Sequence, residues 1–70
     1  MNANTTTPVH TFLISVIGLE GGETLHYNGR TWDVITSDSS LPGVVRVYYV
    51  TEELGMDWLL FRKDDLVVVS

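Results

Sequence analysis

The chain has 70 residues, no cysteine, a net charge of −5 and only four basic residues. This length predicts one domain, and the lack of cysteine excludes disulfides and thiolate metal sites. Four basic residues are too few to neutralise a phosphate backbone, so the composition argues against a nucleic-acid partner and favours a protein partner with a basic surface. Only 19% of the residues are charged. A small domain with so few charges favours an oligomer, such as a homodimer, or a constitutive partner.

Residues 1–8 (MNANTTTP) are polar, with three threonines before a proline. We expect a flexible N-terminal arm there and a single domain over residues 9–70. An alternative function for the arm is to add a strand to a partner's sheet, because threonine favours strands.

The first strand is expected from Val9 to Ile17, where β-branched residues dominate. Its apolar part is far shorter than the roughly 20 residues of a membrane span. No Lys or Arg precedes it, as a signal peptide would require. We therefore expect a cytoplasmic protein without a membrane partner.

A glycine-rich loop, GLEGGE, follows over residues 18–23. It lacks the lysine and the helix start of a phosphate-binding loop, so we interpret it as a structural turn. Thr24 to Thr36 is predicted to form a hairpin around Asn28-Gly29, because a type I′ turn requires positive φ at both central residues.

A polar turn (SDSSLPG) leads to a central hairpin from Val44 to Arg62, with residues 52–57 as its connection. Glu52 and Glu53 lie at the tip of this hairpin, where we expect them to be solvated. Lys63 to Asp65 is predicted to form a single helical or 3-10 turn before a last strand over residues 66–69.

The central hairpin has two unlike faces, because residues i and i+2 of a strand share a face. The predicted core combines one face with residues of other strands: Phe12, Ile14, Trp32, Val34, Val47, Leu59 and Phe61. The opposite row consists of Val44, Arg46, Tyr48 and Val50 in the first arm and Trp58, Leu60 and Arg62 in the second. This row is too apolar for a plain solvated surface. Either another part of the chain covers it, or it is a docking face, since Trp, Tyr and Arg are enriched at interface anchors.

The strand order resembles the SH3-like small barrel. NGRTWDVI is similar to the entry into the second strand of that fold, and WLLFRKDDLVVV to its ending, where one helical turn precedes the last strand. The resemblance covers about residues 11 to 69 and implies an all-β, five-stranded barrel. The peptide-gripping residues of signalling SH3 domains have no match here, so it implies no ligand. The size and acidity also resemble accessory proteins of bacteriophages and other mobile elements.

The sequence contains no convincing catalytic or metal-binding signature. His10 and His26 are the only histidines, and a zinc site would need a third ligand such as Asp33 or Glu23. Ser15, His26 and Asp33 can be combined into a triad, but no nucleophile elbow or oxyanion loop accompanies them. A barrel this small is also expected to lack a pocket of about 300 Å³. We therefore expect no enzyme activity and no cofactor.

Three functions are left open. The first is a protein-binding module that modulates or inhibits a host protein through Arg46, Tyr48, Trp58, Leu60 and Arg62, with Glu52 and Glu53 steering the approach. The second is an assembly subunit that forms homo-oligomers through the same face. The third is a single-stranded nucleic-acid binder that stacks bases on Tyr48 and Trp58.

Overall fold

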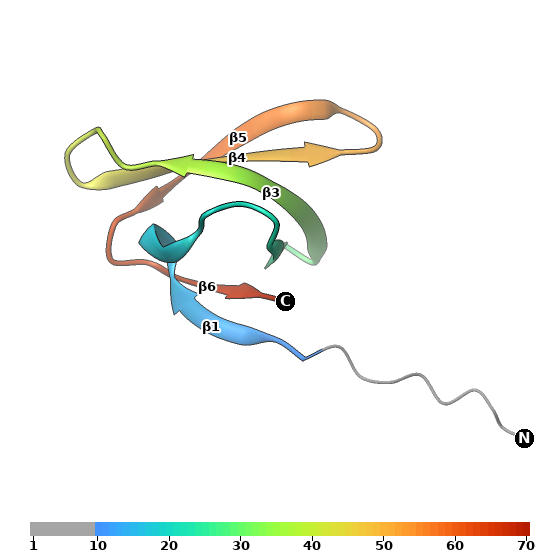
Figure 1. The fold of residues 1–70 in the computed structure, drawn as a ribbon, viewed down its shortest axis with the longest axis horizontal. Helices are drawn as coiled ribbons and strands as arrows, with labels where there is room; N and C mark the ends of the chain where they lie inside the picture. The colour runs from blue at the N-terminus through green and yellow to red at the C-terminus, as the bar shows by residue number, and fades with distance from the viewer. Residues whose placement is uncertain (1–9) are drawn as a thin grey trace, which may run out of the picture.

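A computed structural model describes residues 10–70 as six strands and one short 3-10 helix (Figure 1). The elements are β1 (Phe12–Ser15), η1 (Val16–Gly18), β2 (Thr24–Tyr27), β3 (Arg30–Asp38), β4 (Val44–Thr51), β5 (Gly55–Arg62) and β6 (Leu66–Val69). The strands form one antiparallel sheet in the order β1-β6-β2-β3-β4-β5. The all-β prediction is confirmed. No helix within residues 10–70 has the length and apolar character needed to cross a membrane.

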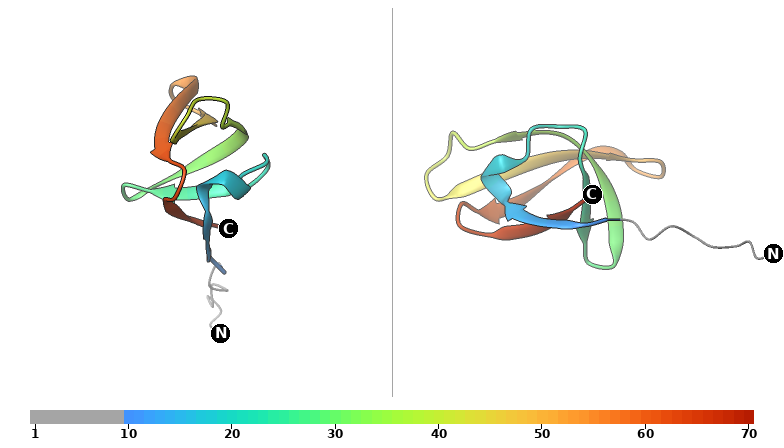
Figure 2. Two further views of the ribbon diagram at one scale, coloured as in Figure 1. Left: turned by 90° about the vertical axis from the view of Figure 1, so that its left-hand side faces the viewer. Right: turned by 60° about the horizontal axis from the view of Figure 1, so that its bottom comes forward.

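The sheet differs from the expected five-stranded barrel in two ways. It has six strands, because residues 24–27, the first arm of the predicted hairpin with β3, also pair with β6 and so belong to the main sheet. It is also open, since β1 and β5 are its two edges and do not pair with each other. The sheet curls strongly, so that β1 and β6 lie opposite β3, β4 and β5 (Figure 2). The interior between these two parts is the core.

The turns follow the local sequence closely, with two corrections. Asn28 and Gly29 have φ of 52° and 72°, as the predicted type I′ turn requires. The β4–β5 connection is shorter than expected, because Thr51 already pairs with Gly55. The 3-10 helix follows β1 and does not precede the last strand; residues 63–65 form a turn in which the Asp65 N–H donates to the Arg62 carbonyl at 3.0 Å. The N-terminal arm and Val9 lie outside the described residues.

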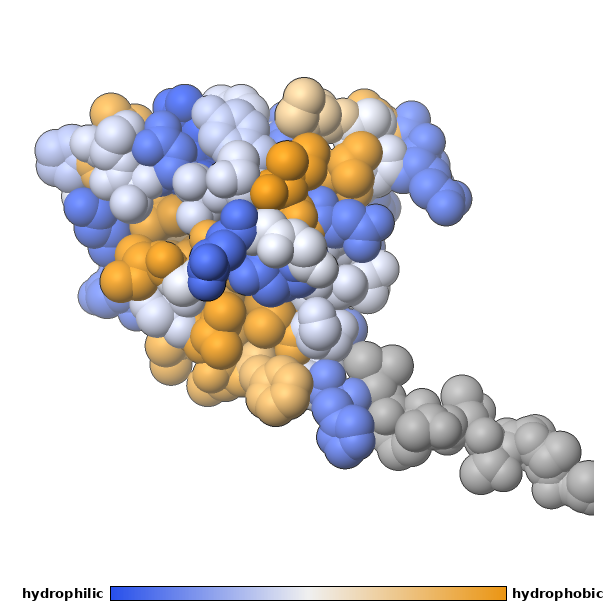
Figure 3. Space-filling view, in the orientation of Figure 1, coloured by the Kyte–Doolittle hydropathy of each residue, from blue (hydrophilic) through white to orange (hydrophobic). Residues whose placement is uncertain are grey.

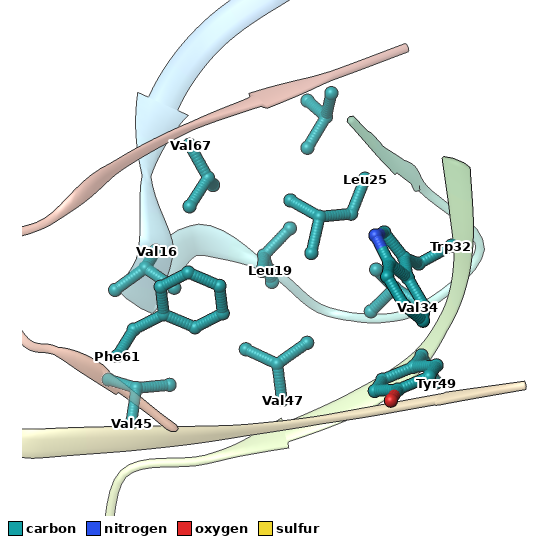
Figure 4. Close-up of a cluster of buried hydrophobic side chains, with 11 residues drawn as sticks. Val16, Leu19, Leu25, Trp32, Val34, Val45, Val47, Tyr49, Phe61 and Val67 are labelled. Atoms are coloured by element: carbon teal, nitrogen blue, oxygen red, sulfur yellow. The ribbon is translucent and has the colours of Figure 1, made fainter. Parts of the chain in front are cut away.

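The core contains eleven buried apolar residues (Figure 4): Val16, Leu19, Leu25, Trp32, Val34, Val45, Val47, Tyr49, Phe61, Val67 and Val69. Four predicted core residues, Trp32, Val34, Val47 and Phe61, are buried, and Ile14 and Leu59 pack partly against them. The prediction for Phe12 is wrong. Its side chain is 62% exposed, because it lies on an edge strand, opposite Val69 at the end of the ladder.

The glycine-rich loop is held against a bulge in β3. The β3–β4 register shifts between Val34 and Thr36, which leaves Ile35 as the extra residue. Gly21 has φ of 128°, and a Cβ there would collide with the Ile35 carbonyl oxygen. Only glycine fits this close approach.

The Glu23 carboxylate binds the same loop from within. It accepts the backbone N–H groups of Glu20 at 2.9 Å and Gly21 at 2.8 Å. Burial alone would raise the pKa of Glu23, but these backbone hydrogen bonds outweigh it and hold the pKa below its ordinary value. The loop is therefore structural, as the sequence indicated.

Candidate protein-binding face

The five residues predicted to share one face of the central hairpin do lie together. Tyr48 pairs with Trp58, Arg46 with Leu60, and Val44 with Arg62 in the β4–β5 ladder. Directly opposed residues of an antiparallel pair point to the same side of the sheet. We call this surface the outer face of the hairpin and define it by Arg46, Tyr48, Trp58, Leu60 and Arg62.

The outer face is open to solvent. Trp58 is 47% exposed and Leu60 is 53% exposed, whereas Val45 and Val47 on the opposite side of β4 are fully buried. Tyr48 and Arg46 are half-buried and Arg62 is exposed. No other segment within residues 10–70 covers the row. The explanation that another part of the chain covers it is therefore wrong for the described residues.

Arg46 is held in place by both aromatic residues of the face. Its guanidinium carbon lies 4.7 Å from the centroid of the Trp58 ring, in a cation–π contact. Its Nη1 donates a hydrogen bond to the Tyr48 hydroxyl at 3.2 Å, and this bond raises the pKa of the guanidinium. The Arg46 Nε is buried and has no hydrogen-bond partner within residues 10–70. The three side chains therefore form an ordered platform before any partner arrives.

Asp38 of β3 borders this platform, because it pairs with Arg46 in the β3–β4 ladder. Its carboxylate accepts the Ser40 backbone N–H at 2.9 Å, and this bond is the main cause of a lowered Asp38 pKa. An ionised carboxylate at this position gives the platform a polar rim.

The face is longer than the sequence predicted. Val50 pairs with Met56 in the same ladder, and these side chains are 39% and 67% exposed. The alternation had already placed Val50 in this row, but Met56 was assigned to the connection; the same alternation, continued by one step in β5, would have included Met56. The Arg46–Trp58 contact is diagonal and not between directly paired residues. Diagonal neighbours lie within reach of long side chains, which is the signal that could have indicated it.

Glu52 and Glu53 lie beyond the end of the row, in the exposed turn between β4 and β5. They line an open cleft of about 980 Å³ between this turn and the β2–β3 turn. A second cleft of about 380 Å³ lies between β5, β6 and β2. The expectation that the molecule has no pocket of about 300 Å³ is therefore wrong, because the sheet does not close and its two ends leave gaps.

Neither cleft assembles the candidate triad. The Nε2 atom of His26 is hydrogen-bonded to the Ser70 hydroxyl at 2.8 Å, and not to Ser15. Asp33 pairs with Thr24 in the β2–β3 ladder, not with His26. Within residues 10–70 no three His, Cys, Asp or Glu side chains are grouped to hold a metal ion. The outer face is therefore the strongest candidate site in the described part of the chain.

The chain matches no family model, no curated protein and no solved structure.

Proposed function

We propose that the protein is a small, non-enzymatic protein-binding module that contacts its partner through the outer face of the hairpin. The observation that carries this proposal is the exposed row of Trp58 and Leu60 beside an Arg46 already fixed on Trp58 and Tyr48. Monomeric proteins rarely expose such a contiguous apolar row without a use for it. Trp, Tyr and Arg are also enriched among the few residues that dominate the binding energy of protein interfaces.

We propose that the partner is a host protein with a basic surface, which this module modulates or inhibits in the host cytoplasm. The net charge of −5 and the exposed Glu52 and Glu53 at the hairpin tip support attraction to such a surface. Small size and acidic composition support an origin as an accessory protein of a bacteriophage or mobile element. The curled sheet supports a relation to the SH3-like barrel, as a variant whose edges stay apart.

Trp58→Ala and Tyr48→Ala test the face. Truncation of an anchor costs about 2 kcal/mol or more of binding free energy, roughly a thirtyfold loss of affinity. We expect both variants to keep the thermal melt of the parent, because these side chains lie outside the core. Capture of the partner from the native host, followed by titration with each variant, measures the loss.

Two controls separate the face from the rest of the hairpin. Leu54→Ala removes a side chain that is 65% exposed in the turn and should bind as the parent does. Glu52→Gln with Glu53→Gln should slow association and reduce its salt dependence with little effect on dissociation, because rim charges mainly steer. A folded Trp58→Ala that binds like the parent would remove the outer face as the site.

The same variants decide between two other functions. The exposed Met56 and Leu60 favour a homo-oligomer interface. If the face is such an interface, the Trp58→Ala variant should have a lower molecular mass in solution than the parent. If it stacks nucleic-acid bases, Trp58→Ala abolishes a salt-dependent shift of single-stranded DNA or RNA.

A further inference from the structure

The free edge of β1 offers backbone groups for pairing. Among the strands of residues 10–70, β1 has a neighbour only on the β6 side. On the other side of β6, Thr24 and Ser70 exchange backbone hydrogen bonds of 3.1 and 2.9 Å, which sets the alternation along that strand. Continued through the β1–β6 register, this alternation turns the N–H and C=O groups of Leu13 and Ser15 away from β6. These groups form an antiparallel pairing site that is complementary to itself.

Large apolar side chains surround this edge. Phe12 is 62% exposed, Leu13 64%, Ile17 57% and Leu66 61%. Figure 3 shows the corresponding apolar surface along the lower side of the molecule, where β1 and β6 lie. Each such side chain presents on the order of 100 Å², so together they give roughly 400 Å² per copy. That is about half of a standard interface per partner, which suits a weak dimer.

The strands β1 and β6 themselves carry no charged side chain. Residues 10–19 and 66–70 contain no Asp, Glu, Lys or Arg. Two copies that each carry a net charge of −5 repel one another, and the repulsion is smallest where no acidic residue lies at the contact. A foreign basic partner would find no carboxylate on β1 itself, whereas a second copy finds a matching neutral strand.

We propose that the occupant of the β1 edge is a second copy of this chain. The two β1 strands pair antiparallel about a two-fold axis and join both sheets into one. Opposed residues must then share a sheet face, so Leu13 lies opposite either itself or Ser15. Apolar pairing selects Leu13 opposite Leu13. This dimer uses the end of the sheet far from the outer face of the hairpin in the strand order, so it does not depend on the proposed function.

Sedimentation equilibrium of the full chain, from about 10 to 1,000 µM, tests the dimer over the range expected for a weak interface. The parent should show a concentration-dependent dimer. Leu13→Lys places two like charges opposite each other at the axis and should weaken the dimer by roughly tenfold or more. Leu54→Lys changes a side chain that is equally exposed, at 65%, in the β4–β5 turn and should dimerise as the parent does.

The outcomes are distinct, provided that thermal melts show both variants folded. A parent that stays monomeric up to the highest concentration overturns the proposal. So does a folded Leu13→Lys that dimerises like the parent, or a parent dimer that Trp58→Ala abolishes and Leu13→Lys leaves intact.

A cross-link tests the register, because the chain has no cysteine of its own. Directly opposed residues of an antiparallel pair have Cα atoms about 4.5–5.5 Å apart, within the range of about 4.4–6.8 Å that a disulfide spans. Under mild oxidation Leu13→Cys should form a covalent dimer much faster than Leu54→Cys. Equal rates would indicate random collision, and a non-covalent dimer of Leu13→Cys that does not cross-link would overturn the Leu13-to-Leu13 register.

Discussion

At the β5 edge of the sheet two carboxylates occupy backbone N–H groups, whereas at the β1 edge no side chain does so within residues 10–70. Asp57 accepts the Trp58 N–H at 2.8 Å, and Asp65 accepts the Arg62 N–H at 2.9 Å. Residues 58 and 62 have the same parity in the strand, so both groups belong to one side of β5. The Lys63 N–H donates to the Gly43 carbonyl at 3.1 Å in the same register, so odd-numbered residues of β5 face β4 and the N–H groups of Trp58 and Arg62 face outward.

This difference follows the length of the two edges. β5 has eight residues and carries the exposed apolar row, so an unprotected edge there would pair with any free strand. β1 has four residues and no charge, so pairing at its edge is short and gives at most a weak contact. The comparison teaches that the two ends are suited to different contacts: side chains on the outer face near β5, and backbone pairing at β1.

Phe61→Ala is expected to have the largest effect, because Phe61 connects the β5 end to the rest of the sheet. Its ring meets the Tyr27 ring of β2 edge-on, with centroids 5.2 Å apart. Loss of the buried ring should cost about 3–5 kcal/mol, out of a total stability of about 5–15 kcal/mol. Chemical unfolding should show a largely unfolded variant. The control Leu60→Ala, at a residue 53% exposed, should unfold like the parent; if both do, Phe61 does not hold the two ends together.

Asp65→Ala should have an intermediate effect and would break the protection of the β5 edge. The variant loses the bond to the Arg62 N–H, at a cost of about 1 kcal/mol to the free energy of unfolding. Combined with Leu13→Lys, which blocks the β1 edge, it should restore concentration-dependent association through β5. Sedimentation equilibrium measures this, with Asp64→Ala as the control on a neighbouring exposed carboxylate. No new association in the double variant would show that Asp65 does not guard the edge.

The smallest effect on stability should come from a substitution of Glu23, which holds the glycine-rich loop between the two ends of the sheet. Its folded pKa lies below the ordinary value of 4.5, so its stabilising contribution is complete above that pH and is lost as the pH falls through the folded pKa. Glu23→Gln should therefore lower stability slightly at neutral pH and flatten the fall in stability below about pH 4.5. Thermal melts from pH 7 to pH 2 give the comparison; parallel curves for both proteins would contradict it.

Local sequence patterns predicted the local structure well. The hairpin from Val44 to Arg62 has the expected outer bounds, and Asn28-Gly29 forms the expected turn. The outer face followed from alternation alone, because one face of this ladder is buried and the register cannot slip by a residue.

Long-range features were not accessible in the same way. Leu19 is buried although it lies beyond the 3-10 helix, where no periodicity marks it. Phe12 shares the parity of core residues but lies at the end of an edge strand. Whether β1 meets β5 depends on the twist and curl of the whole sheet, which no short stretch of residues encodes. The same holds for the Arg46 contact with Trp58, which depends on side-chain conformation across two strands.

The position of β6 has a consequence for how the chain reaches this fold. β2, β3, β4 and β5 each pair with a neighbour in sequence, so these four strands form a meander whose contacts can arise locally. β6 then inserts between β1 and β2, and its pairing with β1 joins the first and the last of the described strands. In a nascent chain that has emerged only as far as β5, β1 therefore has no strand to pair with. The exposed apolar residues of β1 stay uncovered until the four-residue strand β6 has also emerged.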